Sequence, residues 1–137
     1  MRFVSNNLRL PAFVITCIGL AYMSLVPIPK DPGIYMEKAL PLDYAFHAVA
    51  YCLLAFTVMM AFVKQPATLL DRVNIFLWCI LAGSLLEILQ AVIPGINRTC
   101  TVSDFLYNGL GSAIGAFLTP SAWLVASSGQ GNTKEAG

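Results

Sequence analysis

The sequence contains few charged residues: they make up 11% of its 137 residues, whereas 58% are hydrophobic. Soluble domains average about 25% charged residues, so the chain has too few charges to coat a soluble globule of its size. Eight Lys and Arg residues nearly balance seven Asp and Glu residues, and the net charge is +1. This balance, without a basic patch interleaved with aromatics, argues against nucleic acid as a partner.

Residues that hold metals or form disulfides are also scarce. The chain has four cysteines and one histidine, and it contains no C-x-x-C pair. Cys17, Cys52 and Cys79 lie within apolar stretches, where a small buried hydrophobe is the ordinary interpretation, while Cys100 lies in a polar loop. One histidine with scattered carboxylates is not a recognised ligand set. We therefore expect no metal, no other cofactor and no disulfide framework.

The hydrophobic residues fall into four blocks, each close to the length that crosses about 30 Å of hydrocarbon. Their approximate ranges are 10–27, 43–63, 73–93 and 104–126. Arg2 and Arg9 precede the first block, as in a signal peptide, but the block is long and no small-residue cleavage site follows, which favours a retained helix. The sequence thus predicts an all-α membrane protein: four transmembrane helices in an antiparallel bundle over residues 1–126, then a disordered cytoplasmic tail over 127–137.

Local signals and loop charges complete this prediction. Pro94 and Gly95 should end the third helix, and Ser103 is a plausible N-cap for the fourth. Basic residues are enriched on the cytoplasmic side of membranes. Five lie on the side of the N-terminus and three on the opposite side: Arg2, Arg9, Lys64, Arg72 and Lys134 against Lys30, Lys38 and Arg98. The bias favours both termini in the cytoplasm, with loops 29–42 and 94–103 outside.

Polar residues within the apolar blocks gather near the outer ends of three helices. They are Asp43, His47 and Tyr51 in the second helix, Glu87 and Gln90 in the third, Arg98 in the following loop, and Asp104 and Asn108 in the fourth. Because successive helices run in opposite directions, these groups converge on one side of the membrane. His47 and Glu87 should lie at similar depth, given a rise of about 1.5 Å per residue. Since a charge within a spanning helix costs at least about 2.5 kcal/mol, the pattern predicts a polar pocket open to the outer leaflet.

Most of these residues also have an ordinary structural interpretation. Asp43 and Asp104 could be helix N-terminal residues favoured by the helix dipole. Gln90 and Asn108 could be hydrogen-bonding residues between helices, and His47 could be a core histidine with satisfied hydrogen bonds.

The structural interpretation of the three other candidate site residues is as follows. Tyr51 could belong to an interfacial aromatic belt, and Arg98 could be a solvated loop charge. Glu87 is the hardest to explain structurally, because an intramembrane carboxylate is a functional candidate by default. In addition, Gly111 and Gly115 form a GxxxG motif that predicts close packing of the fourth helix, with Gly83 and Ser84 of the third as the complementary surface.

At these residues the sequence resembles the VanZ-like family of small bacterial membrane proteins. The matching pieces are residues 43–51, 87–90, and 98 with 103–111, and the resemblance covers about residues 42–118. The sequence departs from the family at Tyr44, where relatives often carry Lys, and at Cys100. The resemblance implies a bacterial cytoplasmic membrane protein linked to teicoplanin-type glycopeptide resistance. It implies a fold and a residue set but no reaction, so enzymatic activity is left open.

Our main hypothesis is a protein that binds or modifies a membrane lipid or lipid-linked envelope precursor at the outer leaflet. The candidate catalytic residues are His47, Glu87, Asp43 and Asp104, and the candidate substrate-binding residues are Tyr51, Gln90, Arg98 and Asn108. Arg98 would bind an anionic head group, and the acids would hold His47 as a proton carrier. The alternatives are a small proton-coupled transporter and a structural membrane scaffold. A homo-oligomer is left open.

Overall fold

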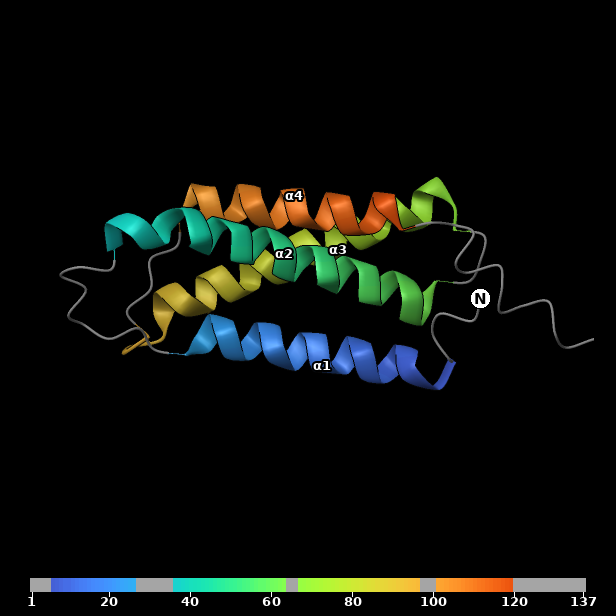
Figure 1. The fold of residues 1–137 in the computed structure, drawn as a ribbon, viewed down its shortest axis with the longest axis horizontal. Coiled ribbons are helices and arrows are strands. Elements are labelled where there is room, and N and C mark those ends of the chain that lie inside the picture. The colour runs from blue at the N-terminus through green and yellow to red at the C-terminus, as the bar shows by residue number, and fades with distance from the viewer. Residues whose placement is uncertain (1–5, 27–35, 64–66, 97–100, 120–137) are drawn as a thin grey trace, which may run out of the picture.

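The computed structural model describes residues 6–26, 36–63, 67–96 and 101–119, with side chains placed from Leu8 in the first of these segments and from Tyr44 in the second. These residues form four helices and no strand (Figure 1): α1 (Asn6–Leu25), α2 (Met36–Phe62), α3 (Leu69–Val92) and α4 (Val102–Leu118). The all-α prediction is confirmed. The predicted tail over 127–137 lies outside the described residues, so the division at residue 126 stays a prediction.

Three of the four helices are long and apolar enough to cross a membrane. The qualifying segments are Leu8–Leu25, Tyr44–Phe62 and Leu69–Val92. Helix α4 has 17 residues, which corresponds to about 26 Å at 1.5 Å per residue. It is therefore slightly shorter than the hydrocarbon core of about 30 Å.

The bounds of all four helices differ from the predicted blocks, most clearly in α2 and α4. Helix α2 begins at Met36, seven residues before Asp43. Helix α4 is capped by Thr101, so the prediction of Ser103 as the cap is wrong. Thr101 is favoured because Asp104, three residues later, completes a capping box with it. Helix α4 ends at Leu118, before Pro120, since the residue preceding a proline is disfavoured in a helix; residues 120–126 lie outside the described segments.

Helix α3 has Glu87 and Gln90 on its buried face and many of its large apolar side chains on its exposed face. The buried residues are Ile75, Cys79, Gly83, Glu87 and Gln90, at helical spacing. The exposed face carries Leu77, Leu81, Leu85, Ile88 and Val92. This is the reverse of the usual pattern for a surface helix in water, and it suits a helix whose outer face contacts hydrocarbon.

Helix α4 packs closely against α2 through the two glycines of its GxxxG motif. A Cβ atom on Gly111 would collide with the backbone carbonyl of Ala48, and one on Gly115 would collide with that of Cys52. The prediction of close packing is thus confirmed, but the predicted partner surface on α3 is wrong. Gly83 instead faces α2, where a Cβ atom would come within 3.1 Å of the Tyr51 ring.

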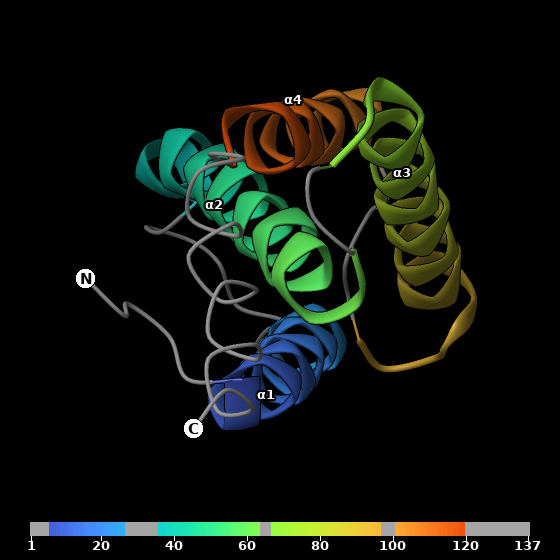
Figure 2. The same cartoon turned by 90° about the vertical axis from the view of Figure 1, so that its right-hand side faces the viewer.

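Helix α1 is peripheral. Only 6% of the residues in its apolar segment are buried, compared with 33% for α2, and it lies beside α2 on the side away from α4 (Figure 2). Phe13, Cys17 and Leu20 of α1 pack against the core. The Phe13 ring meets the Phe62 ring edge to face at 5.0 Å, and the Gln90 side chain donates a hydrogen bond to the Ser24 carbonyl at 2.9 Å.

Arg72 joins the start of α3 to the end of α4. Its guanidinium donates hydrogen bonds to the carbonyls of Ala116, Phe117 and Thr119 at 2.7, 3.1 and 3.1 Å. The last carbonyls of a helix have no partner within the helix, and a cation there also interacts favourably with the helix dipole. These bonds help to fix how α3 and α4 lie against each other at the end opposite His47.

Candidate functional site

Three polar side chains from two helices surround the imidazole ring of His47. His47 Nδ1 of α2 lies 2.8 Å from Asn108 Oδ1 of α4 and 3.8 Å from Glu87 Oε1 of α3. His47 Nε2 lies 3.9 Å from Asp104 Oδ1. We call His47, Glu87, Asp104 and Asn108 the His47 cluster. The structure therefore brings together residues that the sequence predicted to converge.

The His47 cluster is buried. Glu87 is 3% exposed, Asp104 is 6% exposed and Asn108 is 2% exposed, and the His47 side chain is 13% exposed. Removing a carboxylate from water is costly unless a partner compensates it. A cation between Glu87 and Asp104 would supply this compensation, and the His47 ring, which is a cation when protonated, lies within 4 Å of both carboxylates. The arrangement thus places a group that can carry a proton at a fixed position.

The hydrogen bond between His47 and Asn108 defines the orientation of the ring. Since the amide oxygen is an acceptor, Nδ1–H of His47 donates to Oδ1 of Asn108. In the neutral ring this leaves the Nε2 lone pair on the side of Asp104. Asn108 is itself held by its helix, because its backbone carbonyl accepts from the Ser112 hydroxyl at 2.7 Å.

The two carboxylate oxygens of Asp104 face different partners, one at the start of its own helix and one at His47. Its Oδ2 accepts from the Thr101 backbone N–H at 3.1 Å and from the Thr101 hydroxyl at 2.6 Å. Its Oδ1 faces His47. The capping interpretation and the cluster interpretation of Asp104 therefore both apply.

Tyr51 lies one turn after His47 on α2 and is 3% exposed. Its ring packs against Gly83, where the absence of a side chain allows α3 to approach. Asp43 lies one turn before His47 in α2, but its side chain is outside the described residues. The shared face predicted for the three residues is therefore tested only for His47 and Tyr51.

Of the other predicted site residues, Gln90 has a partner outside the cluster. Gln90 is 4% exposed and its amide is bonded to the Ser24 carbonyl of α1, which matches the interhelical interpretation. Arg98 lies outside the described residues, as does Cys100.

Sequence reasoning did not find a stacked pair of tyrosines beside the cluster. The Tyr44 and Tyr107 rings are parallel within 5°, with centroids 4.9 Å apart. Tyr44 precedes His47 by three residues and Tyr107 precedes Asn108 directly. Each is adjacent to a cluster residue, but no spacing rule connects two positions so far apart in the sequence.

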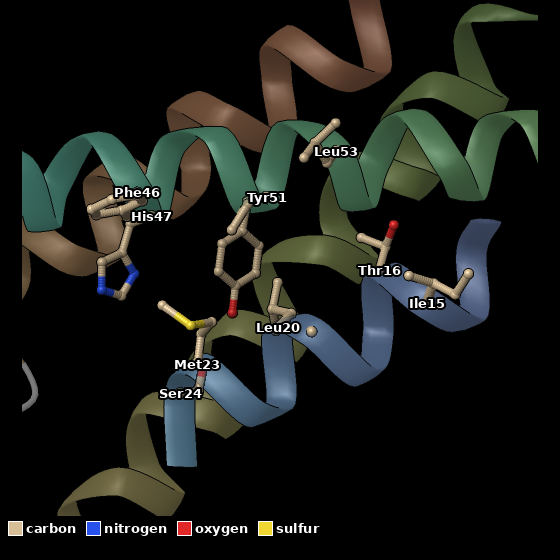
Figure 3. Close-up of a pocket in the computed structure, with 11 residues that line it drawn as sticks. Ile15, Thr16, Leu20, Met23, Ser24, Phe46, His47, Tyr51 and Leu53 are labelled. Atoms are coloured by element: carbon tan, nitrogen blue, oxygen red, sulfur yellow. The ribbon is translucent and has the colours of Figure 1, made fainter. Parts of the chain in front are cut away.

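A pocket between α1 and α2 was also not predicted. Figure 3 shows the Tyr51 hydroxyl and the His47 ring on the side of α2 that faces α1. The pocket volume is about 360 Å³. The pocket is lined by Ile15, Thr16, Gly19, Leu20, Met23 and Ser24 of α1 and by Phe46, His47, Ala50, Tyr51 and Leu53 of α2. The cluster thus borders a cavity through His47.

Within the described segments, no group of three or more His, Cys, Asp or Glu residues is arranged to hold a metal ion. The cysteines in these segments, Cys17, Cys52 and Cys79, are free thiols. The imidazole, carboxylates and amide of the His47 cluster can support proton transfer and hydrogen bonding.

Comparison with known proteins gives one match. The family model described as VanZ/LLP1 matches residues 13–125. This range includes α2, α3, α4 and most of α1, and therefore every residue of the His47 cluster. No curated protein and no solved structure matches the chain.

Proposed function

The chain belongs to the VanZ/LLP1 family, and from this premise we propose that it binds or modifies a lipid-linked cell-envelope substrate at the His47 cluster. The observation that carries the proposal is the burial of Glu87, Asp104 and Asn108 around His47, from three different helices. Burying these polar groups in an apolar protein costs free energy. A functional requirement would explain why the protein contains them. The family name further suggests a link to teicoplanin-type glycopeptide resistance.

We place the protein in the bacterial cytoplasmic membrane as an antiparallel bundle of four spans with both termini in the cytoplasm. The exposed residues of α4 support a fourth span, since they include Phe105, Leu106, Leu110, Ile114 and Leu118. Its buried residues are small or polar. A helix of about 26 Å can cross the membrane where the bilayer thins locally. The excess of Lys and Arg on the side of the N-terminus supports the orientation.

In this proposal His47 is the proton carrier and its neighbours set its state. The Asn108 side chain accepts a hydrogen bond from Nδ1–H of His47, so the neutral ring presents its Nε2 lone pair as a base. Glu87 and Asp104 stabilise the ring after it has taken a proton, since both carboxylates lie within 4 Å. Arg98 of the adjacent loop would contribute a positive charge for an anionic head group. The roles of Asp43 and Gln90 stay predictions.

The composition of the core supports binding over proton-coupled transport. Beyond Tyr51, the buried residues in the described segments include Leu54, Ala55, Met59 and Ala116 and no Asp, Glu, Lys, Arg or His. The buried hydroxyls there, of Thr57, Ser112 and Thr119, donate to carbonyls of their own helices. A transporter needs a polar route on both sides of its site, and this region separates the His47 cluster from Arg72 at the other end. The transporter alternative predicts that Glu87→Gln abolishes proton-driven uptake or efflux in proteoliposomes.

The test is to replace His47, Glu87 and Arg98 singly with alanine and to assay glycopeptide susceptibility in cells that depend on this protein for resistance. We expect at least one variant to be folded, by size exclusion and thermal unfolding, yet unable to confer resistance. The matched control is Asn74→Ala, an exposed polar residue of α3, which should leave resistance unchanged. If all three alanine variants fold and confer normal resistance, the proposal is wrong. If each loses resistance only in proportion to its loss of stability, the scaffold interpretation is favoured.

A further inference from the structure

The pocket between α1 and α2 has two different ends. Most of its lining consists of apolar side chains and of Gly19, where a Cβ atom would have no atom within 4 Å. At its α2 wall it is bordered by His47 and by Tyr51 (Figure 3). A cavity with apolar walls and a few polar groups is the usual form of a small-molecule site. Its shape therefore suits a ligand that is itself part apolar and part polar.

The opening of the pocket is apolar. Four of its lining side chains are half exposed or more: Ile15 at 68%, Met23 at 58%, Phe46 at 62% and Leu53 at 50%. All four lie in the two helix segments that are long and apolar enough to span a membrane. An opening rimmed by such side chains would face hydrocarbon, so a ligand would enter sideways from the bilayer.

The polar end of the pocket contains the Tyr51 hydroxyl. Tyr51 is 3% exposed as a whole residue and is one of the residues that line the pocket. In Figure 3 the hydroxyl points from α2 toward α1, into the pocket. A hydroxyl both donates and accepts hydrogen bonds, so a polar atom of a bound molecule can pair with it there.

We propose that the α1–α2 pocket binds a single hydrocarbon chain of an amphiphile, with the polar group of the amphiphile at the Tyr51 hydroxyl and the His47 ring. The volume of about 360 Å³ is at the lower end of the range for ligand pockets and is far too small for a whole two-chain phospholipid. The inference rests on the proposed function, because it gives the lipid-linked substrate of the His47 cluster a place for its chain. The inference also gives a role to α1, which contributes no residue to the His47 cluster.

The test uses stearic acid with a diazirine in its chain, added to the purified full-length protein in phosphatidylcholine nanodiscs. After illumination, peptide mass spectrometry compares labelling of the pocket residues with labelling of the outer face of α3 around Leu81, which any membrane lipid can reach. We expect preferential labelling of Ile15, Gly19, Met23, Phe46 and Leu53. Equal labelling of the two regions would overturn the proposal.

Two substitutions in the pocket and one control substitution outside it test whether labelling depends on the pocket residues. Gly19→Leu fills the cavity without a backbone clash, and we expect it to lower pocket labelling about tenfold. Tyr51→Phe keeps the ring against Gly83 but removes the hydroxyl, and we expect a loss of about fivefold. Ala12→Leu, an exposed α1 position outside the pocket lining, should change nothing. Unchanged labelling in both Gly19→Leu and Tyr51→Phe would overturn the proposal.

This inference and the proposed function can fail separately. If the pocket is not labelled but His47→Ala still abolishes resistance, the function at the cluster stands and the chain site is wrong. If labelling follows the expected pattern but none of the cluster variants affects resistance, the amphiphile site stands and the envelope function is wrong.

Discussion

Single residues of the His47 cluster carry two roles each, one within their own helix and one toward a neighbouring helix. Asp104 completes the cap of α4 through Oδ2 and faces His47 through Oδ1. Asn108 accepts a hydrogen bond from His47 with its side chain and one from Ser112 with its backbone carbonyl. Since these groups are buried, removing one partner leaves another polar atom without compensation. Stability and ring orientation are therefore coupled at this site.

Asn108→Ala tests this coupling. The substitution removes the acceptor of His47 Nδ1–H, so we expect the free energy of unfolding to fall by about 1–3 kcal/mol. The measurement is equilibrium unfolding in detergent, monitored by circular dichroism. Asn74→Ala, at an exposed position of α3, is the matched control and should be neutral. Equal stability of the two variants would contradict the account.

At the scale of helices, the close packing of α2 and α4 positions the cluster. Gly111 and Gly115 bring α4 against the backbone of α2 at Ala48 and Cys52. Ala48 directly follows His47, and Gly111 lies three residues after Asn108, so this contact is adjacent to the hydrogen bond between the two side chains. The small residues thereby determine the distance across which His47 can reach Asn108.

Gly111→Ala should be strongly destabilising, by about 3 kcal/mol or more, because the added Cβ meets backbone atoms of Ala48 that cannot move independently. Gly109→Ala is a control on the same helix, since its Cβ would have its nearest neighbour at 4.0 Å. This control should be neutral or slightly stabilising, because alanine is a better helix former than glycine. Thermal unfolding of both variants decides the question: similar stabilities of the two variants would mean that the close contact at Gly111 does not limit the packing of α4 against α2.

The sequence predicted the helices and the convergence of the cluster for physical reasons that are local. Hydrophobic block length determines a span, and helical spacing puts His47 and Tyr51 on one face of α2. The partner of the GxxxG face was predicted wrongly, because the motif does not encode which neighbour it contacts. The Tyr44–Tyr107 stack and the α1–α2 pocket depend on the rotation of each helix about its axis. Only tertiary packing sets that rotation.

For the whole molecule, the buried side of the bundle is polar and small around His47, while its surface is apolar. Many large hydrophobic side chains are more than half exposed, among them Ile15, Tyr22, Leu70, Trp78 and Leu118. Such a surface would aggregate in water but is suited to a bilayer. The buried charged groups lie near one end of the bundle, around His47, and the core beyond Tyr51 includes Leu54, Ala55 and Met59, so the two ends of the bundle are dissimilar.

Reporter fusions test the number of spans and their orientation. If α4 crosses the membrane, the chain crosses four times and both termini lie in the cytoplasm. A C-terminal fusion to green fluorescent protein should then fluoresce, and a C-terminal fusion to alkaline phosphatase should be inactive. An active phosphatase fusion would mean that α4 does not span, since the C-terminus would then lie outside. A fusion after Ile96, beyond α3, is the control and should show the opposite pattern.

The central claim, that His47 is enclosed by groups from α3 and α4, can be tested on one side chain because the chain has a single histidine. The measurement is ¹⁵N nuclear magnetic resonance of histidine-labelled protein in nanodiscs. We predict that the neutral ring carries its proton on Nδ1, and that Asn108→Ala and Glu87→Gln each shift the ring nitrogen signals whereas Asn74→Ala does not. Signals typical of a freely solvated imidazole, unchanged by substitutions at Asn108 and Glu87, would contradict the account.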